Sequence, residues 1–268
     1  MSINFKEQVD SLETRIKIHD KYGSKNIDQW MIDKLNLKTK KSILDLGCGD
    51  GKQIFAIYSH LKKKNKNNKI KIIGVDEHKK LVKNANLKIQ NKNIKFKVGN
   101  FDRKLPFKSN SFDLVISSFA IYYASNINKT LIEIDRVLKK GGQLFFIGPM
   151  PNNKFEFNEI VESAAKKKIP ELIGSSRFSS EIFQKVYEKF DKAKIDVFKN
   201  ELIFDNYIPF YDYTKSALEK KRGVYANFFK GINQKIVFKK IEILMKNRFL
   251  KLGRLKMTKL VGGITAFK

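Results

Sequence analysis

The chain has 268 residues, of which 42% are hydrophobic, which is enough to bury a large core within one domain. No apolar run approaches the ~18–20 residues that a membrane-spanning helix requires, and the first residues are mixed and charged, unlike a secretion signal. We therefore expect a cytoplasmic protein without a membrane span. The single cysteine, Cys48, excludes an internal disulfide, and the three histidines are far apart, so we expect no metal site.

The composition is strongly basic, with 55 Lys and Arg residues against 27 Asp and Glu residues and a net charge of +28. Such a charge attracts nucleic acid nonspecifically. Most of the excess is Lys, is spread along the whole chain, and accompanies abundant Asn, Ile and Phe, the residues that AT-rich codons encode. We interpret the charge as compositional, and nucleic-acid recognition as the alternative. The Lys-rich run at 62–69 is typical of a solvated loop.

Hydrophobic patterning in the first half of the chain predicts alternating helices and strands. A helical segment extends to about Leu37, and the expected strands and helices follow it. The strands are expected at 41–46, 70–75, 94–98, 112–118 and 143–148, and the helices at 51–61, 79–90 and 128–138. Strands separated by helices favour right-handed crossovers, which predicts an α/β fold: a Rossmann-like, doubly wound, mainly parallel sheet with helices on both faces.

The pattern changes after Pro149. Amphipathic helices are expected at 155–168 and 179–190, and final strands at 191–204 and 255–268 bring the sheet to seven strands. The segment 205–254 between them is helical and rich in aromatic residues. Because no repeat or linker marks a second unit, we predict one domain over 1–268. It comprises an N-terminal helical segment (1–40), an α/β core (41–150) and a helical cap (151–190 and 205–254).

The most informative segment is Ile-Leu-Asp-Leu-Gly-Cys-Gly-Asp-Gly at 43–51, between a strand and a helix. Glycines there let the backbone turn sharply and approach a ligand closely, and the following helix offers unpaired N–H groups. The spacing is Asp-x-Gly-x-Gly-x-Gly, not the Gly-x-Gly-x-x-Gly of dinucleotide enzymes. Asp45 would repel a pyrophosphate and attract the amino group of a bound amino acid.

Two later segments extend this site. Asp76 ends the second strand, 25 residues after Gly51, where a carboxylate can accept hydrogen bonds from both ribose hydroxyls. The segment Gly-Asn-Phe-Asp at 99–102 follows the third strand, where a short polar side chain and backbone N–H groups can contact an adenine edge. Together these positions favour an adenosine ligand.

These motifs, with Leu-Pro-Phe at 105–107, Ser-Phe-Asp-Leu-Val at 111–115 and Arg-Val-Leu-Lys-Lys-Gly-Gly at 136–142, resemble the class I S-adenosylmethionine-dependent methyltransferases, especially the quinone-biosynthesis and small-molecule enzymes. The resemblance covers about 40–150 and implies S-adenosyl-L-methionine as the cofactor, with 1–40 as a lid. The cofactor-binding residues that it implies are Asp45, Gly47, Cys48, Gly49, Gly51, Asp76, Glu77, Asn100, Phe101, Asp102 and Ser117. Asn100 stands where the family usually has aspartate, with Asp102 as a register-shifted substitute, and Lys140 replaces a usual proline.

Methyl transfer from a sulfonium is an in-line displacement on an activated carbon, so no particular catalytic residue is obligatory. Tyr122 and Tyr123, after the fourth strand, are candidates to border the methyl group, and packing at the strand end is the alternative. His19, in the lid segment, is a candidate base, and a surface histidine is the alternative. The aromatic residues of 204–213, with Phe228 and Phe229, would either roof an acceptor or pack helices on the sheet.

The sequence thus predicts an enzyme that methylates an O, N or C atom of a small-molecule acceptor. One alternative is an RNA ribose or base methyltransferase, but an Asn/Asp-Pro-Pro-Tyr motif is missing and the single cysteine lies in the glycine loop. Another is a noncatalytic protein that binds the cofactor and a partner. An NAD-dependent oxidoreductase is disfavoured by the glycine spacing and by Asp45. The sequence does not indicate the acceptor or the oligomeric state.

Overall fold

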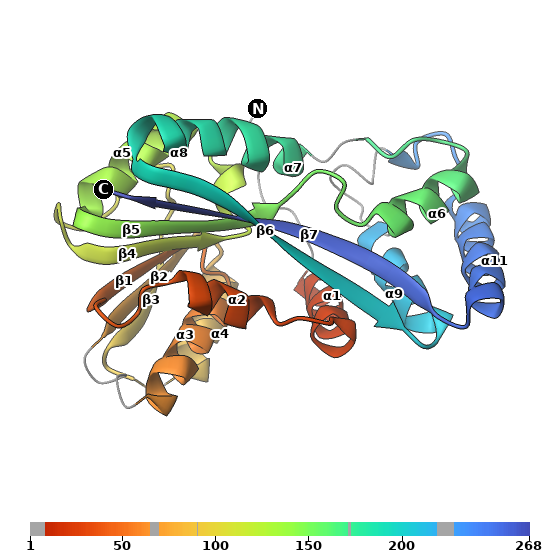
Figure 1. The fold of residues 1–268 in the computed structure, drawn as a ribbon, viewed down its shortest axis with the longest axis horizontal. Coiled ribbons are helices and arrows are strands. Elements are labelled where there is room, and N and C mark those ends of the chain that lie inside the picture. The colour runs from red at the N-terminus through yellow and green to blue at the C-terminus, as the bar shows by residue number, and fades with distance from the viewer. Residues whose placement is uncertain (1–8, 65–69, 90, 171–172, 219–227) are drawn as a thin grey trace.

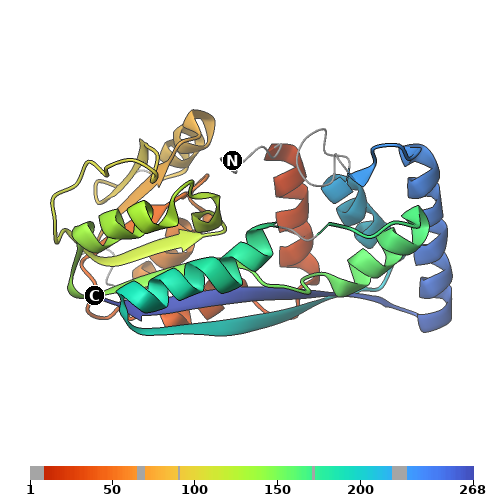
Figure 2. The same cartoon turned by 90° about the horizontal axis from the view of Figure 1, so that it is seen from above.

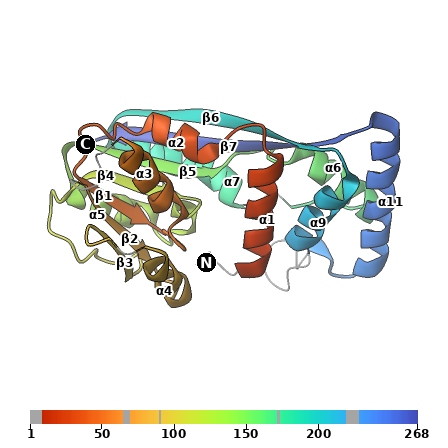
Figure 3. The same ribbon diagram turned by 90° about the horizontal axis from the view of Figure 1, so that it is seen from below.

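The computed structural model of the protein describes residues 9–64, 70–89, 91–170, 173–218 and 228–268. The molecule is elongated, with a sheet covered by helices at one end and a group of helices at the other (Figure 1). Helix α1 (Val9–Tyr22) stands between the two ends, as the turned views show (Figures 2 and 3). We refer to the two ends as the sheet lobe and the helical lobe.

The sheet lobe is built on one seven-stranded sheet with the strand order β3-β2-β1-β4-β5-β7-β6. The first five strands in chain order run parallel, and β7 is antiparallel to both β5 and β6. The strands are β1 (Ser42–Leu46), β2 (Lys71–Asp76), β3 (Ile94–Val98), β4 (Phe112–Ser118), β5 (Leu138–Pro149), β6 (Asp191–Phe204) and β7 (Leu255–Phe267). This topology confirms the predicted doubly wound, mainly parallel α/β fold.

Helices cover both faces of this sheet, because each carries an apolar stripe at helical spacing. On α5 (Ile127–Val137), Leu131 and Ile134 are buried in one core cluster with β4 and β5. On α3 (Lys52–Lys63), Ile54 and Ile57 are buried in the cluster on the opposite face. The second face is shared by α2 (Ile27–Lys34) and α4 (Lys79–Lys88).

The entry into β5 differs from the prediction. The sequence predicts a helix at 128–138 and a strand from 143, with the Gly141-Gly142 pair between them, whereas β5 begins directly after α5 at Leu138. Leu138 pairs with Phe112 and Gln143 pairs with Leu114, so the intervening residues bulge out of the ladder. Gly141 has φ of 73°, which suits the bulge.

Strands β6 and β7, which residues 205–254 separate in the sequence, pair antiparallel along their length. We call this pair the β6–β7 hairpin, and it connects the lobes. They pair from Asp191 with Phe267 as far as Phe204 with Leu255, whereas β5 pairs only with 261–267 of β7. The part of the hairpin beyond β5 enters the helical lobe, where Leu202 and Phe204 are buried. The hairpin is therefore part of the sheet at one end and the floor of the helical lobe at the other (Figure 1).

The helical lobe packs α1, α6 (Phe155–Ala165), α9 (Tyr207–Leu218) and α11 (Gln234–Leu252) around the end of this hairpin. Phe204 and Phe210 stack with their ring centroids 5.1 Å apart, and both are fully buried. Phe228 is also buried in this cluster. Of the two interpretations of these aromatic residues, packing in the core is the one that the structure shows for Phe204, Phe210 and Phe228.

The segment 151–190, which we expected to belong to the cap, divides between the lobes. Helix α6 lies in the helical lobe, whereas α7 (Ile173–Arg177), the π-helical turn η3 (Phe178–Ile182) and α8 (Phe183–Lys189) follow one another along the sheet, beside α5 (Figure 1). The buried Phe178, Ile182 and Val186 belong to the same core cluster as β5. Within the described ranges, no helix combines the length and apolar character needed to cross a membrane.

Candidate active site

The carboxyl ends of β1, β2 and β4 define the candidate site. Strand β1 lies between β2 and β4, so the chain leaves it in one direction and returns on the other side, and ligands bind at such a switch point in doubly wound sheets. The glycine loop that follows β1 lies at this point. Gly47, Gly49 and Gly51 all have positive φ, of 73°, 55° and 91°.

The loop glycines differ in what surrounds them. A Cβ on Gly47 would come within 2.2 Å of the Ala120 Cβ, and one on Gly51 within 2.8 Å of the Phe96 ring. A Cβ on Gly49 would meet no atom of the described residues within 4 Å. Gly47 and Gly51 are therefore required by packing, whereas Gly49 borders open space in which a ligand can approach the backbone.

Asp45 lies beneath this loop with its side chain 0% exposed. Neither of its carboxylate oxygens has a hydrogen-bond partner among the described residues. Burial, with a further contribution from the charge of Asp76, raises the pKa of Asp45 to about 8. A buried carboxylate without a partner is costly, and a bound cation would remove that cost.

Asp76 fastens the glycine loop to the end of β2. Its Oδ2 accepts a hydrogen bond from the Gly49 N–H at 2.8 Å, and its Oδ1 accepts one from the His78 N–H at 2.8 Å. Each carboxylate oxygen has a further lone pair for a ligand hydroxyl. The next residue, Glu77, is exposed and accepts a hydrogen bond from Asn100 Nδ2 at 2.9 Å.

The segment after β3 borders the loop from the other side. The Phe101 ring is 3.5 Å from the position that a Cβ on Gly47 would occupy. The Asp102 carboxylate accepts hydrogen bonds from the Ser125 N–H at 3.0 Å and from Ser125 Oγ at 2.7 Å. Asp102 therefore links this segment to the turn before α5, and its carboxylate is already engaged within the protein.

Cys48 and Ser117, two further residues of the predicted set, use their side chains within the fold. The Cys48 thiol lies 2.8 Å from the position of a Cβ on Gly74, and burial raises its pKa. Ser117 is buried, and its Oγ donates to the Leu46 carbonyl at 2.7 Å. Only the backbone of Cys48 can line the loop, and Ser117 links β4 to the end of β1.

Tyr122 and Tyr123 form the short helix η2 (Ile121–Tyr123) directly after β4. Their ring centroids are 4.6 Å apart, and their hydroxyls are hydrogen-bonded to each other. Burial raises the pKa of both phenols, so both are neutral at pH 7. Phe119, just before them, has a φ of 54°, a left-handed conformation that is strained for an aromatic residue.

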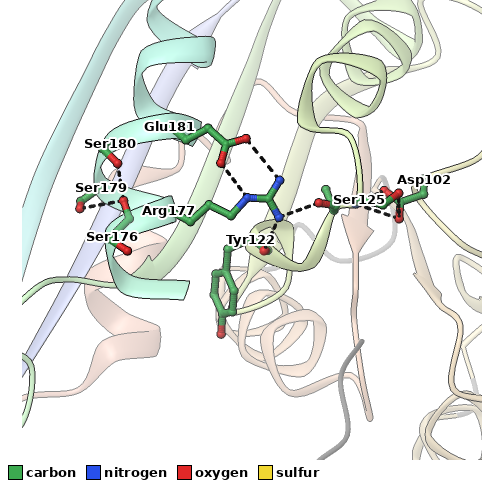
Figure 4. Close-up of polar contacts among 9 residues, drawn as sticks. Asp102, Tyr122, Ser125, Ser176, Arg177, Ser179, Ser180 and Glu181 are labelled. Atoms are coloured by element: carbon green, nitrogen blue, oxygen red, sulfur yellow. Dashed lines mark hydrogen bonds and ion pairs between the residues drawn. The ribbon is translucent and has the colours of Figure 1, made fainter. Parts of the chain in front are cut away.

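Arg177 of α7 holds this turn in place, a role that the sequence pattern did not reveal. Its Nη1 donates to the Tyr122 carbonyl at 2.9 Å and to the Ala124 carbonyl at 2.6 Å (Figure 4). Its Nε donates to Glu181 at 2.9 Å. A Cβ on Gly174, one turn earlier, would lie 3.1 Å from the Tyr122 ring, so the helix packs closely on the tyrosine.

His19 of α1 is half-buried and faces the helical lobe, so it is not the freely exposed surface histidine of our alternative. Its ring lies edge-on to Tyr213 of α9, with the centroids 5.7 Å apart. Burial, together with the charges of Lys259, Arg15 and other basic residues, lowers the pKa of His19 well below its ordinary value. His19 is therefore neutral at pH 7 and able to accept a proton.

Comparison with known proteins decides the family of this site. The family described as "Methyltransferase domain" matches residues 37–194, which is more than half of the chain. The chain belongs to this methyltransferase family. With its glycine loop and strand order, it is a member of the class I, S-adenosylmethionine-dependent group. The match includes the sheet lobe as far as the start of β6 and omits α9, α11 and β7.

Individual relatives agree with this family. The chain is 26% identical to an uncharacterized methyltransferase, YcgJ, of Bacillus subtilis over 56% of each protein. It is 33% identical to the ubiquinone/menaquinone biosynthesis C-methyltransferase UbiE of Rickettsia prowazekii over 52% of each. A putative methyltransferase of Bacillus halodurans shares the fold, with a TM-score of 0.56 and 18% identity over 90% of this chain and 98% of that one. The chain spans about half the length of the curated relatives it matches.

Proposed function

We propose that this methyltransferase domain binds S-adenosyl-L-methionine and transfers its methyl group to an O, N or C atom of a small-molecule acceptor. The observation that carries the proposal is Asp45, a fully buried carboxylate without a partner among the described residues, beneath a loop in which Gly49 faces open space. The cofactor, when bound, supplies a methyl group on a sulfonium and a primary ammonium group. The ammonium group matches the charge that Asp45 needs.

The remaining residues fit the other parts of this cofactor. Asp76 keeps lone pairs for the ribose hydroxyls while its existing hydrogen bonds to Gly49 and His78 fix its orientation. Phe101 borders the loop, and we assign Phe101 and Asn100 to the adenine. The side chains of Asn100 and Asp102 are both engaged within the protein, Asn100 by Glu77 and the Asp102 N–H and Asp102 by Ser125.

The protein's contribution to methyl transfer is alignment and exclusion of water. Tyr122 is held by Arg177 and by the packing of Gly174, so its position next to the strand end is fixed. The neutral tyrosine pair presents a largely apolar surface to a reacting methyl group. His19 is neutral and so is available as a base for acceptors that must lose a proton.

Calorimetric titration tests the cofactor part of the proposal. Purified protein, checked to be free of nucleic acid, is titrated with S-adenosylmethionine, S-adenosylhomocysteine and NAD in parallel. Binding of both sulfur nucleotides but not NAD supports the proposal, and an Asp76→Ala variant should bind them weaker by about 2–4 kcal/mol, because it loses charge-assisted hydrogen bonds to the ribose. Absence of binding would instead favour a noncatalytic interaction protein, and unchanged affinity of Asp76→Ala would refute the ribose assignment.

A further inference from the structure

Basic side chains from several elements gather around Tyr213 of α9 in the helical lobe. The Lys259 Nζ of β7 is 3.4 Å from the Tyr213 hydroxyl. The centroid of the His19 ring of α1 is 5.7 Å from that of the Tyr213 ring. The Phe157 ring centroid is 6.1 Å from that of Tyr213, and Lys154 Nζ lies 4.4 Å from the Phe157 ring centroid. Arg15 of α1 belongs to the same group, because its charge acts on the pKa values of His19, Lys154 and Lys259. We call the four basic residues Arg15, His19, Lys154 and Lys259 the basic cluster.

Lys154 occupies its position at a double energetic cost. Its side chain is only 6% exposed, and its backbone is left-handed, with φ of 65°. Such a conformation is strained for a residue with a Cβ, and burying an ammonium group carries a further desolvation cost. Lys166 and Lys192 also have positive φ, but their side chains are exposed. The combination at Lys154 is typical of strain kept for a function.

The basic residues of the cluster act on one another's pKa values. Burial and the neighbouring charges of Lys154 and Arg15 lower the pKa of Lys259 well below its ordinary value. Burial likewise lowers the pKa of Lys154. Glu156, two residues after Lys154, accepts hydrogen bonds from Thr258 N and Oγ1, both at 2.7 Å. An anion would be attracted by the charged members of the cluster and would favour the protonated forms of Lys154 and Lys259.

The cluster also adjoins the site of methyl transfer. The charge of Arg15 acts on the pKa values of Tyr122 and Tyr123 as well as on those of Lys154 and Lys259, so both groups lie within electrostatic reach of Arg15. Lys52, the first residue of α3 after the glycine loop, acts in turn on His19. Helix α1, which carries Arg15 and His19, stands between the two lobes (Figure 3).

We propose that the basic cluster binds an anionic oxygen group, a carboxylate or a phosphate monoester, of the methyl acceptor. The proposal rests on the proposed methyltransferase function and narrows its substrate class. The burial of Lys154 favours a small anionic group on a compact molecule over the backbone of a nucleic acid, which would contact exposed lysines instead. The anion fixes the acceptor at one end while its reacting atom reaches the tyrosine pair.

The test uses inorganic phosphate and acetate as probes of the two anion types. Each is titrated into the full chain saturated with S-adenosylhomocysteine, at constant ionic strength set with sodium chloride, and the thermal unfolding midpoint is followed. Lys259→Met and Lys154→Met are compared with Lys239→Met, which removes the same charge from the exposed surface of α11. We expect one of the probes to stabilise the wild type and Lys239→Met beyond the effect of chloride, with about tenfold weaker apparent binding in Lys259→Met.

Each result has one meaning. Stabilisation by phosphate alone or by acetate alone identifies the anionic group, and its loss in Lys259→Met locates the site. Equal responses to both probes and to chloride, or an undiminished response in Lys259→Met, would overturn the proposal even if Lys154→Met fails to fold. Titration of S-adenosylhomocysteine on the same samples separates the two proposals, because its failure to bind removes the methyltransferase function without removing a specific response to the anion.

Discussion

The two lobes assemble their functional residues in different ways. In the sheet lobe, the residues that we assign to the cofactor lie in short segments at the ends of strands, at 45–51, 76–77 and 99–102. In the helical lobe, the residues around Tyr213 come from α1, from the start of α6, from α9 and from the far half of β7. The proposed cofactor site is therefore encoded by local sequence motifs, whereas the proposed acceptor site is assembled by long-range topology.

The physical reason lies in the sheet. Parallel strands bring their carboxyl ends to one edge, so a motif that follows each strand is placed by the fold itself. The helical lobe has no such edge. Its helices pack around the end of the β6–β7 hairpin. Next to this hairpin, Gly148 of β5 and Gly262 of β7 leave room for the Phe178 ring of η3, because Cβ atoms at these two positions would lie 2.4 and 3.0 Å from the ring.

The largest expected effect is on the cofactor side. Asp45→Asn should weaken binding of S-adenosylhomocysteine by at least about 100-fold, since removing one partner of a buried ion pair costs about 3–5 kcal/mol. Calorimetry on the variant measures this loss. Asp50→Asn changes the same charge in the same loop at an exposed position and should leave the affinity within about threefold of the wild type.

The same substitution should act on stability with the opposite sign. Because the pKa of Asp45 is raised to about 8 in the folded protein, the folded state holds a proton that the unfolded state releases near pH 4. The free energy of unfolding of the ligand-free wild type, relative to Asp45→Asn, should therefore fall as pH rises from about 4 to about 8, by up to about 1.4 kcal/mol per unit. Parallel curves for the two proteins in urea would show that Asp45 is solvated and that the lobe has no buried site for a cation.

The second expected effect is the pH dependence of cofactor affinity. Binding requires the ionised form of Asp45, so below its pKa of about 8 the affinity should rise by up to about tenfold per pH unit, with release of a proton. Calorimetric titration at about pH 6.0, 6.5, 7.0 and 7.5, in buffers of different ionisation enthalpy, measures the affinity and the number of protons released on binding. In Asp45→Asn the slope should vanish, and a wild-type slope near zero would contradict the assignment of Asp45 to the ammonium group.

The sequence predicted the sheet lobe well because its signals are local. The strands at 94–98 and 112–118 were predicted at their observed bounds, and Asp45, Gly49 and Asp76 were singled out from their spacing. The entry into β5 was wrong by several residues because pairing between strands, rather than the glycine pair, sets where that strand begins. Helix α7 was missed before Ser179, where serines of low helix propensity hydrogen-bond to carbonyls of the preceding turn.

The acceptor side could not be predicted in the same way. Lys154 and Lys259 are ordinary lysines in a chain with 55 basic residues, and only the fold shows that they converge. Arg177 acts on carbonyls more than 50 residues away in sequence. His19 was considered as a base, but its pKa is lowered by burial and by charges that include Lys259, Lys52 and Lys154 from other elements of the fold.

The third expected effect sharpens the comparison at a single glycine of each lobe. Gly49→Ala should weaken cofactor binding by about tenfold, because a Cβ there would project into the open space next to the backbone and because Ala is strained at positive φ by about 1 kcal/mol. Gly253→Ala, at the end of α11, carries the same strain, and a Cβ there also meets no atom within 4 Å. It should lower stability equally and leave cofactor affinity unchanged. Equal affinities of the two variants would mean that no ligand occupies the space beside Gly49.

The smallest expected effect on cofactor affinity is that of a substitution at Arg177, beside the tyrosine turn. Arg177→Gln removes hydrogen bonds to the Tyr122 and Ala124 carbonyls and leaves buried acceptors unpaired, so it should lower the free energy of unfolding by about 1–3 kcal/mol. Glu181→Gln removes only the ion pair on the exposed side of Arg177 and serves as the matched control, with an expected cost below about 1 kcal/mol. Because Arg177 positions the tyrosine turn and touches none of the glycine-loop residues in the described hydrogen bonds, the affinity for S-adenosylhomocysteine should change by less than about threefold, or 0.7 kcal/mol. A larger loss of cofactor affinity in Arg177→Gln than in Glu181→Gln, at matched stability, would show that the turn after β4 belongs to the cofactor site. In that case, residues positioned by long-range contacts would contribute to the cofactor site as well as to the acceptor site.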